Sequence, residues 1–246
     1  MIVIAGPCQQ ESDADSLEIA RHCQKVCDKY KIDYYFKASF DKANRTYDDS
    51  PRGLGFEESK YDFEMLRKQF MVTTDFHETS QIDEFPEVDC YQIPAFLSKQ
   101  TDLIKKAAAT GKKVNIKKGQ FMSPEDVKGI LSKTTERENG IWITERGTQF
   151  GYGRTVVDFQ GVQDMKEMGA NVFLDVTHSV SERKYSRQMA AIAGHLGLYL
   201  FVEVHKNPDK APSDGKKMIA LEDFNDLVGR HEHSMLHSSS YRKFKD

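Results

Sequence analysis

The sequence predicts an α/β protein that folds as a single-domain (β/α)8 TIM barrel. Two observations support this prediction. Short β-rich runs alternate strictly with amphipathic stretches, eight of each, and the strand starts are about 28 residues apart. The chain has 246 residues, which suits one barrel, and no internal repeat or low-complexity linker divides it. Because helical stretches separate consecutive strands, the strands must be parallel, and eight units favour a closed barrel over an open sheet.

The expected strands are short runs rich in β-branched, aromatic and other apolar residues. The second run is unusual because the string YYFKASF holds a lysine among apolar residues. In chain order the expected strands are Ile2–Ala5, Tyr34–Ala38, Met71–Thr74, Val88–Gln92, Lys113–Ile116, Ile141–Thr144, Asn171–Asp175 and Tyr199–Glu203.

Eight amphipathic segments occupy the intervals between and after these strands. Ser123 is a typical cap for the fifth segment, with Pro124 at its first helical position. In chain order the expected helices are Ser16–Lys29, Glu57–Phe70, Ser80–Phe85, Lys99–Ala109, Pro124–Lys133, Val156–Met168, Arg183–Leu196 and Ile219–Val228.

The end of the chain has no hydrophobic periodicity. We therefore expect the barrel domain over residues 1–228 and a polar, solvated C-terminal tail over residues 229–246. Three histidines lie in this tail, His231, His233 and His237, but no carboxylate or cysteine accompanies them at a fixed spacing. The tail is therefore not interpreted as a metal site.

Composition excludes several classes of function. There are 35 basic and 38 acidic residues, for a net charge of −3, so neither nucleic acid nor a membrane surface is expected as a partner. No apolar run is long enough to span a membrane, and the opening MIVIAG is too short for a signal peptide. The four cysteines are sparse and irregularly spaced, which is typical of a reducing compartment. The sequence thus predicts a soluble cytoplasmic protein.

In a barrel of this kind, functional groups lie at the C-terminal ends of the strands. All eight expected strand ends carry polar residues, and the cationic group among them consists of Lys37, Lys42, Arg45, Lys117 and Arg146. Several such cations indicate substrates with more than one anionic group, because guanidinium groups match phosphates and carboxylates. The alternative is that some are ordinary solvated loop charges. That alternative suits Lys118 better than Lys37, which lies inside an apolar run.

A second group at the strand ends has the donor atoms of a metal site. Its members are Cys8, His178, Glu203 and Asp214. A thiolate, an imidazole and two carboxylates suit zinc, iron, manganese or cobalt in the divalent state. The four residues are far apart in sequence, so a buried cysteine with unrelated polar neighbours is the alternative. Closure of a barrel would nevertheless place the first, seventh and eighth strands side by side.

Seven motifs in one order make a resemblance to a known family recognisable. They are IAGPC (Ile4–Cys8), FKASFDKANR (Phe36–Arg45), TTDFHE (Thr73–Glu78), QIPAFLSKQTDL (Gln92–Leu103), VNIKKGQF (Val114–Phe121), TERGTQFGY (Thr144–Tyr152) and DVTHS (Asp175–Ser179). Together they resemble the 3-deoxy-manno-octulosonate 8-phosphate synthase family, from about Ile2 to Leu227. The sister 3-deoxy-arabino-heptulosonate 7-phosphate synthases share the barrel and the GPC motif. The run DKANR followed by QIPAFL is more similar to the eight-carbon enzymes.

The resemblance implies a transferase that condenses phosphoenolpyruvate with arabinose 5-phosphate and releases inorganic phosphate. It also implies a homotetramer and a place in cell-envelope sugar synthesis. Within the family, a cysteine after the GP of the first strand is typical of the metal-dependent branch. Cys8 at this position implies a divalent metal ion held by Cys8, His178, Glu203 and Asp214.

The resemblance also implies roles for the other polar residues. The residues expected to hold the phosphate and carboxylate of phosphoenolpyruvate are Lys42, Lys117 and Arg146. Those expected to receive the phosphate of the sugar are Asn44, Arg45 and Thr46. Those expected to line the space between the two substrates are Lys37, Asp75, Gln92 and Phe96. The expected catalytic residues are Lys37, Lys42, Asp75, His178 and His205, the last either as a support for the metal ligands or as a proton-handling group.

The chain departs from the family pattern after the seventh strand. The family carries a long Gly-rich loop there, whereas THSV runs into SERKYSRQM, about ten residues shorter and without glycine. Arg187 is the candidate to replace an arginine of that loop. This departure leaves two alternatives open. One is the same condensation with another phosphosugar such as erythrose 4-phosphate, and the other is a catalytically weakened barrel that binds phosphosugars.

Overall fold

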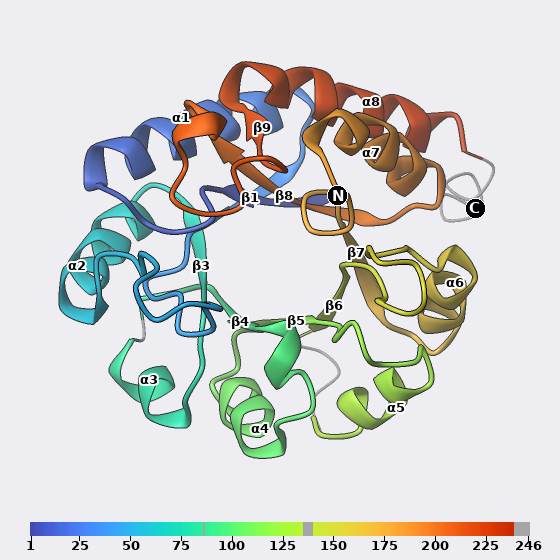
Figure 1. The fold of residues 1–246 in the computed structure, drawn as a ribbon, viewed down its shortest axis with the longest axis horizontal. Coiled ribbons are helices and arrows are strands. Elements are labelled where there is room, and N and C mark those ends of the chain that lie inside the picture. Colours follow the sequence, from blue (N-terminus) through green and yellow to red (C-terminus); the bar gives the residue numbers. More distant parts are fainter. Residues whose placement is uncertain (86, 135–139, 239–246) are drawn as a thin grey trace.

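Eight parallel strands pair in chain order, and β1 pairs with β8, so that the sheet closes into a barrel. The computed structural model describes residues 1–85, 87–134 and 140–238 (Figure 1). The strands are β1 Ile2–Gly6, β2 Asp33–Lys37, β3 Met71–Asp75, β4 Cys90–Ile93, β5 Lys113–Lys117, β6 Ile141–Glu145, β7 Asn171–Asp175 and β8 Tyr199–His205. A two-residue strand, β9 (Ile219–Ala220), pairs with the end of β8. The predicted barrel is confirmed.

Helices surround the strands on the outside of the barrel, one after each strand (Figure 1). They are α1 Asp13–Lys29, α2 Phe56–Arg67, α3 Thr79–Glu84, α4 Thr101–Ala109, α5 Asp126–Leu131, α6 Phe159–Glu167, α7 Ser186–His195 and α8 Phe224–Leu236. Among the described residues, no helix is both long and apolar enough to cross a membrane.

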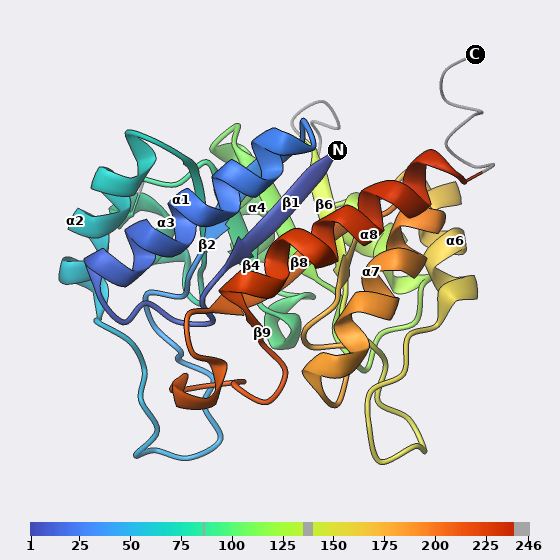
Figure 2. The same cartoon turned by 90° about the horizontal axis from the view of Figure 1, so that it is seen from above.

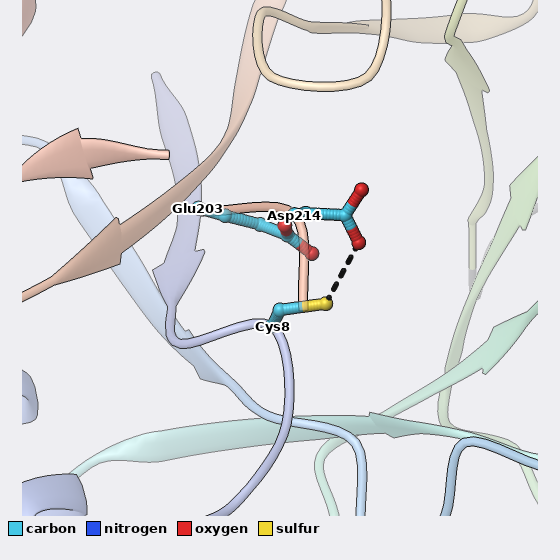
Figure 3. A group of neighbouring side chains, drawn as sticks. All are labelled: Cys8, Glu203 and Asp214. Atoms are coloured by element: carbon cyan, nitrogen blue, oxygen red, sulfur yellow. Dashed lines mark hydrogen bonds between the residues drawn. The ribbon is translucent and has the colours of Figure 1, made fainter. Parts of the chain in front are cut away.

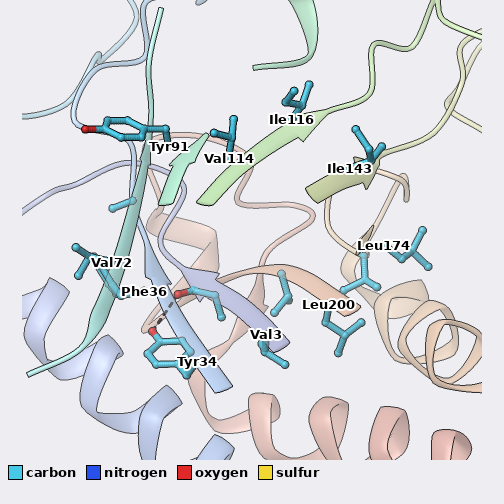
Figure 4. Close-up of a cluster of buried hydrophobic side chains, with 14 of the residues drawn as sticks. Val3, Tyr34, Phe36, Val72, Tyr91, Val114, Ile116, Ile143, Leu174 and Leu200 are labelled. Carbon is cyan, nitrogen blue, oxygen red and sulfur yellow. Dashed lines mark hydrogen bonds between the residues drawn. The ribbon is translucent and has the colours of Figure 1, made fainter. Parts of the chain in front are cut away.

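Side chains alternate between the two faces of each strand, and this alternation divides the core into two parts. The larger part lies between strands and helices and includes Val3, Tyr34 and Leu200 (Figure 4). The smaller part fills the barrel interior with Ile4, Tyr35, Cys90, Trp142, Phe173 and Phe201. The rings of Tyr35 on β2 and Trp142 on β6 lie 5.2 Å apart, although these strands are not neighbours, so the contact crosses the interior.

The same alternation decides which polar residues point into the barrel. Two positions beyond the apolar interior layer, towards the C-terminal ends, the inward-facing residues are Lys37, Asp75, Gln92, Lys117, Asp175 and Glu203. All six are buried. The floor of this end of the barrel is therefore a polar layer on an apolar one.

The loops at this end are the longest of the molecule. The β2–α2 loop (residues 38–55) and the β6–α6 loop (residues 146–158) project beyond the strands, together with the β8–β9 loop (residues 206–218) (Figure 2). The N-terminus lies at the opposite end of the barrel. Long loops around one mouth and short turns at the other are typical of barrels whose ligands bind at the C-terminal face.

The expectation that a solvated tail begins after residue 228 is wrong, because a helix continues across this position. The segment expected as a helix from Ile219 begins with β9 instead, and α8 runs from Phe224 to Leu236, so residues 229–236 are not a solvated tail. The buried face of α8 consists of Phe224, Leu227, Val228 and His231, a helical spacing in which histidine takes an apolar position. The polar appearance of His231 concealed this continuation. Residues 239–246 of the expected tail lie outside the described residues.

Candidate active site

A polar cavity opens at the C-terminal end of the barrel. Seven strands or the loops that follow them contribute its walls, and β1 with its loop adjoins it through Cys8. The lining residues are Lys37, Lys42, Asn44, Asp75, Gln92, Pro94, Ala95, Phe96, Lys117, Gln120, Arg146, His178 and Glu203. Most of the residues predicted from the sequence to bind or transform substrates are thus neighbours in one cavity.

One side of the cavity is built on a buried ion pair between β2 and β3. Lys37 Nζ lies 3.1 Å from Asp75 Oδ1 and donates a hydrogen bond of 2.7 Å to Ser39 Oγ, which in turn donates to Asp75. Burial alone would raise the pKa of Asp75, but the charges of Lys37 and Lys42 outweigh it and hold that pKa below its usual range. His77 Nε2 lies 3.7 Å from the other carboxylate oxygen. Asp75 is therefore an anion stabilised by two lysines.

A second buried network joins β5 and β7. Lys117 Nζ pairs with Asp175 Oδ2 and lies 3.2 Å from the centre of the Phe201 ring. Burial lowers the pKa of Lys117 to about 8, although the charges of Asp175 and Glu203 oppose this shift. Asp175 Oδ2 also lies 2.7 Å from His178 Nδ1. A proton on Nδ1 satisfies this bond and leaves the lone pair of Nε2 available on the cavity side.

Three of the four residues expected to hold a metal ion form one cluster, and His178 lies beside it. Ligand atoms of Cys8, Glu203 and Asp214 all lie within 4.8 Å of one another (Figure 3), and Cys8 Sγ donates to Asp214 Oδ2 over 3.3 Å. His178 Nε2 lies 3.6 Å from Glu203 Oε1 and 4.0 Å from Asp214 Oδ2. Closure of the barrel brings this set together, because β1 pairs with β8 and places Gly6 beside Glu203.

These residues fit a divalent cation. Glu203 is 1% exposed, and neither of its carboxylate oxygens has a hydrogen-bond partner among the described residues. An ionised carboxylate buried without a partner is costly, so a cation at this position would remove a large penalty. Burial and the nearby Glu203 raise the pKa of Cys8 to about 12, so its thiolate also requires a positive neighbour. The sulfur, nitrogen and oxygen donors suit a borderline metal ion.

The residues expected around the sugar phosphate lie in the β2–α2 loop. Asn44 lines the cavity, whereas Arg45 Nη2 donates to the carbonyl oxygen of Pro212 in the β8–β9 loop over 3.3 Å. Thr46 is exposed and is not among the lining residues. Phe96 also lines the cavity but is 63% exposed, so its ring lies at the rim.

His205 lies next to the cavity rather than in its lining. Its Nε2 is 2.9 Å from Glu11 Oε1, and its Nδ1 accepts a hydrogen bond of 3.0 Å from the backbone N–H of Asn207. Both ring nitrogens are therefore engaged within the protein. This geometry favours a structural connection between β8 and the β1–α1 loop over a proton-handling role.

Lys118 is not a solvated loop charge, contrary to expectation. It is 2% exposed, and its Nζ lies 3.3 Å from Glu145 Oε2. Glu145 also accepts a hydrogen bond from the backbone N–H of Gly147, which fixes the chain around Arg146. Lys118 and Glu145 are out of phase with the inward-facing residues of their strands, and this alternation is the signal that could have identified the pair.

Other site residues were missed or placed wrongly from the sequence. Ser39 and Gln120 were not singled out, yet Ser39 connects Lys37 to Asp75, and Gln120 lines the cavity with an unpartnered buried Oε1. Arg187 does not replace an arginine of a lid. Its guanidinium pairs with Asp223 and Asp226 near the start of α8, over 2.7 and 2.8 Å.

Comparisons with known proteins agree in one family. Residues 1–235 match the model of the DAHP synthetase I family. A protein of Brucella canis named 2-dehydro-3-deoxyphosphooctonate aldolase is 42% identical over 238 residues, covering 90% of this chain and 86% of that protein. Proteins of the same name from Synechococcus sp. and Caulobacter vibrioides are 43% and 40% identical, covering 91% and 92% of this chain and 84% of each relative.

Proposed function

The chain belongs to the DAHP synthetase I family, and on this premise we propose that it catalyses the reaction of its 2-dehydro-3-deoxyphosphooctonate aldolase relatives. It condenses phosphoenolpyruvate with arabinose 5-phosphate and water to give 3-deoxy-manno-octulosonate 8-phosphate and inorganic phosphate. The enol carbon of phosphoenolpyruvate forms a bond to the aldehyde carbon of the sugar. Water adds to the neighbouring carbon, and the C–O bond to the phosphate breaks.

One observation carries this assignment: the cavity has more cations than its own carboxylates neutralise. Lys37 pairs with Asp75 and Lys117 with Asp175, whereas Lys42 and Arg146 have no carboxylate within ion-pair distance among residues 1–85, 87–134 and 140–238. Two substrates with phosphate groups would supply the missing negative charge. Holding both together is an advantage of proximity worth about 7–11 kcal/mol of the barrier.

The roles of individual residues are part of the proposal. Lys42, Lys117 and Arg146 bind the phosphate and carboxylate of phosphoenolpyruvate, and Gln120 joins them from the cavity wall. The phosphate of the sugar is received by Asn44, Arg45 and Thr46 at the rim. The pair of Lys37 and Asp75 lies between the two substrates, together with Gln92 and Phe96. Lys37 is held by Ser39 and Asp75 in one position, which is what a proton donor to the reacting aldehyde oxygen requires.

A divalent metal ion, namely zinc, iron, manganese or cobalt, is proposed as the cofactor, with Cys8, His178, Glu203 and Asp214 as its ligands. When bound, such an ion supplies Lewis acidity towards the sugar aldehyde or the attacking water. Asp175 supports the arrangement by holding the His178 ring with Nε2 directed at Glu203 and Asp214. A carboxylate that binds the second ring nitrogen of a histidine ligand is common at metal sites.

The decisive experiment measures phosphate release from phosphoenolpyruvate with arabinose 5-phosphate, before and after a strong chelator. We expect release that chelation abolishes and a divalent metal restores. Phosphate release that continues after chelation would support the condensation reaction and exclude a requirement for the metal ion. Parallel assays with erythrose 4-phosphate test the alternative acceptor suggested by the short loop after β7. If the protein binds phosphoenolpyruvate but turns over neither sugar, the result would favour the alternative of a catalytically weakened barrel that binds phosphosugars.

Cys8→Ala tests the metal site directly. We expect it to lose most bound metal and most activity while its circular dichroism stays unchanged, because only one thiol is removed. Cys90→Ala is the matched control, since Cys90 is equally buried and its pKa is also raised to about 12 by burial. Metal content by elemental analysis should fall only in Cys8→Ala. Equal metal content in both variants would refute the assignment.

Arg45→Ala tests the placement of the two phosphates. Loss of a charge-assisted hydrogen bond costs about 1.5–3 kcal/mol, so the KM for arabinose 5-phosphate should rise about 10- to 100-fold. The KM for phosphoenolpyruvate should change little. Arg52→Ala serves as the control, because Arg52 belongs to the same loop but pairs with Asp41. Equal effects of Arg45→Ala on both substrates would mean that the phosphates are placed wrongly.

We also propose a homotetramer in the cytoplasm. Exposed aromatic side chains support an interface: Phe121, Phe150 and Tyr152 are 61%, 86% and 72% exposed on the loops after β5 and β6. All four cysteines are free thiols, which supports a reducing compartment. Light scattering on the purified protein measures the number of subunits.

A further inference from the structure

The short loop after β7 is fastened to the loop that carries Asp214. Residues 176–185 contain no glycine, and a 3-10 turn from Arg183 to Tyr185 leads directly into α7. At this turn, Arg183 reaches across to the β8–β9 loop (residues 206–218). No other arginine among the described residues makes a contact with both Asp209 and Gly215.

Arg183 holds the β8–β9 loop at two points. Its Nη2 lies 2.5 Å from Asp209 Oδ1 and donates a hydrogen bond of 2.7 Å to the carbonyl oxygen of Gly215. The backbone N–H of Arg183 donates to the carbonyl oxygen of Lys216 over 3.1 Å. Asp209 lies near the start of the loop, whereas Gly215 and Lys216 directly follow Asp214. One residue therefore joins both arms of the loop to the turn that precedes α7.

Asp214 needs such support because its backbone is strained. Its φ is +51°, in the left-handed region that is uncommon for residues other than glycine, although aspartate adopts it more often than most. Gly215 packs so tightly that a Cβ on it would lie 2.1 Å from the carbonyl oxygen of Pro208, so the two arms of the loop touch. A strained residue keeps its conformation only where its surroundings hold it. The contacts of Arg183 adjoin this residue.

The side chain of Asp214 itself has little else to fix it. It is 33% exposed, and its side-chain partners among the described residues are Cys8 Sγ at 3.3 Å and His178 Nε2 at 4.0 Å, which belong to the same proposed metal site. Glu203, by contrast, is held by the buried backbone of β8. The carboxylate most dependent on its loop is therefore Asp214.

We propose that Arg183 is a positioning residue, which holds the β8–β9 loop so that the Asp214 carboxylate stays in place to bind the divalent cation. The inference rests on the metal site of the proposed function. It differs from a lid mechanism, because Arg183 connects the short loop after β7 to the metal-site loop. Supporting residues around metal ligands commonly change metal affinity 10- to 100-fold when removed.

Arg183→Ala tests the inference by metal affinity rather than by activity. The metal-free protein is titrated with Co²⁺, and the thiolate-to-cobalt charge-transfer absorption of Cys8 reports binding. Competition with a chelator of known affinity then gives the Kd for Zn²⁺. We expect the Kd to rise about 10- to 100-fold in Arg183→Ala. Arg183→Lys should lie between wild type and Arg183→Ala, because an ammonium group still donates to Gly215.

Arg187→Ala is the matched control. Its guanidinium is 36% exposed against 33% for Arg183 and also forms surface ion pairs, but with Asp223 and Asp226. It should bind Co²⁺ like the wild type. An unchanged Kd in Arg183→Ala, or an equal loss in Arg187→Ala, would overturn the inference while leaving the metal site standing. A wild type that binds no Co²⁺ would overturn the metal site and the inference together.

If Arg183→Ala does not fold, Arg183→Lys and Asp209→Asn decide the matter. Asp209→Asn removes only the charge of the outer partner, which is 82% exposed, so folding should tolerate it. We expect both variants to weaken Co²⁺ binding less than tenfold, with the change larger in Arg183→Lys. Wild-type Kd values in both would refute the role of Arg183.

Discussion

At the scale of single residues, three buried lysines are each compensated by a carboxylate. Lys37, Lys117 and Lys118 each have a carboxylate within 4.0 Å. Removing one partner of such a pair leaves a buried charge alone, which typically costs 3–5 kcal/mol. We therefore expect substitutions of the paired carboxylates to affect folding as well as catalysis. Lys42 and Arg146 line the same cavity without such a partner among the described residues and are the better probes of substrate binding.

The pKa of Lys117 predicts an alkaline limit of activity. Burial lowers this pKa to about 8, so the ammonium group loses its proton, and with it its attraction for phosphate, as the pH rises through that value. The kcat/KM for phosphoenolpyruvate, which reports on the free enzyme, should fall above pH 8. Lys117→Met should have a lower kcat/KM without this limb. A wild-type profile that stays flat to pH 10 would contradict the prediction.

At the scale of elements, helix α8 completes the outer layer of the barrel. It packs on α7, and Gly194 of α7 allows this approach, since a Cβ there would lie 2.1 Å from the carbonyl oxygen of His231. His231 is fully buried, and its Nε2 lies 2.8 Å from the carbonyl oxygen of Leu198, just before β8. That oxygen only accepts, so Nε2 carries the proton and the buried Nδ1 does not. The helix is thus tied to the strand that carries Glu203.

His231 makes the stability of this connection depend on pH. Burial lowers its pKa to about 4, whereas an unfolded histidine titrates near 6.5. Between these two pH values, His231 is protonated in the unfolded chain but not in the folded chain. Its contribution to the free energy of unfolding is therefore complete above pH 6.5 and is lost as the pH falls towards 4. His231→Gln keeps a donor for Leu198 without titrating. At pH 7, we expect urea unfolding to show that the free energy of unfolding of the variant is lower than that of the wild type by about 1 kcal/mol at most.

At lower pH the order of these two proteins should reverse. The free energy of unfolding should fall more steeply for the wild type between pH 6.5 and 4, so His231→Gln becomes the more stable protein near pH 5. The difference between the two curves isolates His231, because every other titrating group is shared. Parallel curves for wild type and variant would contradict the prediction.

At the scale of the whole molecule, the barrel was predictable because its signal repeats. Eight apolar runs separated by amphipathic stretches leave parallel strands with helical crossovers as the consistent solution. The same regularity predicts much of the site, since residues such as Lys37 and Asp75 lie at the strand ends where barrel sites form. Closure then accounts for Cys8 meeting Glu203 from the two ends of the chain.

What the sequence did not predict depends on burial or long-range contacts that residue type does not reveal. Lys118 is basic and adjoins a loop, yet Glu145 from the next strand neutralises it inside the wall of the barrel. His231 is polar, yet it occupies the apolar face of α8. Arg183 acts through contacts with a loop more than twenty residues away, and no local pattern specifies them. Each of these cases could be recognised only once the three-dimensional neighbours of the residue were known.

The shared cavity predicts that substrate binding stabilises the entire barrel. Groups from β2, β5 and β6 would hold phosphoenolpyruvate together, so only the closed barrel binds it. A ligand at 100 times its Kd adds about 2.7 kcal/mol to the free energy of unfolding, and for a domain of this size this raises Tm by about 5–10 °C. Calorimetry in the presence of chelator should reveal this rise for phosphoenolpyruvate and a much smaller one for pyruvate, which lacks the phosphate. In Arg146→Ala most of the rise should disappear, because a charge-assisted bond of about 1.5–3 kcal/mol is lost. The same rise in wild type and Arg146→Ala would mean that phosphoenolpyruvate binds elsewhere on the barrel.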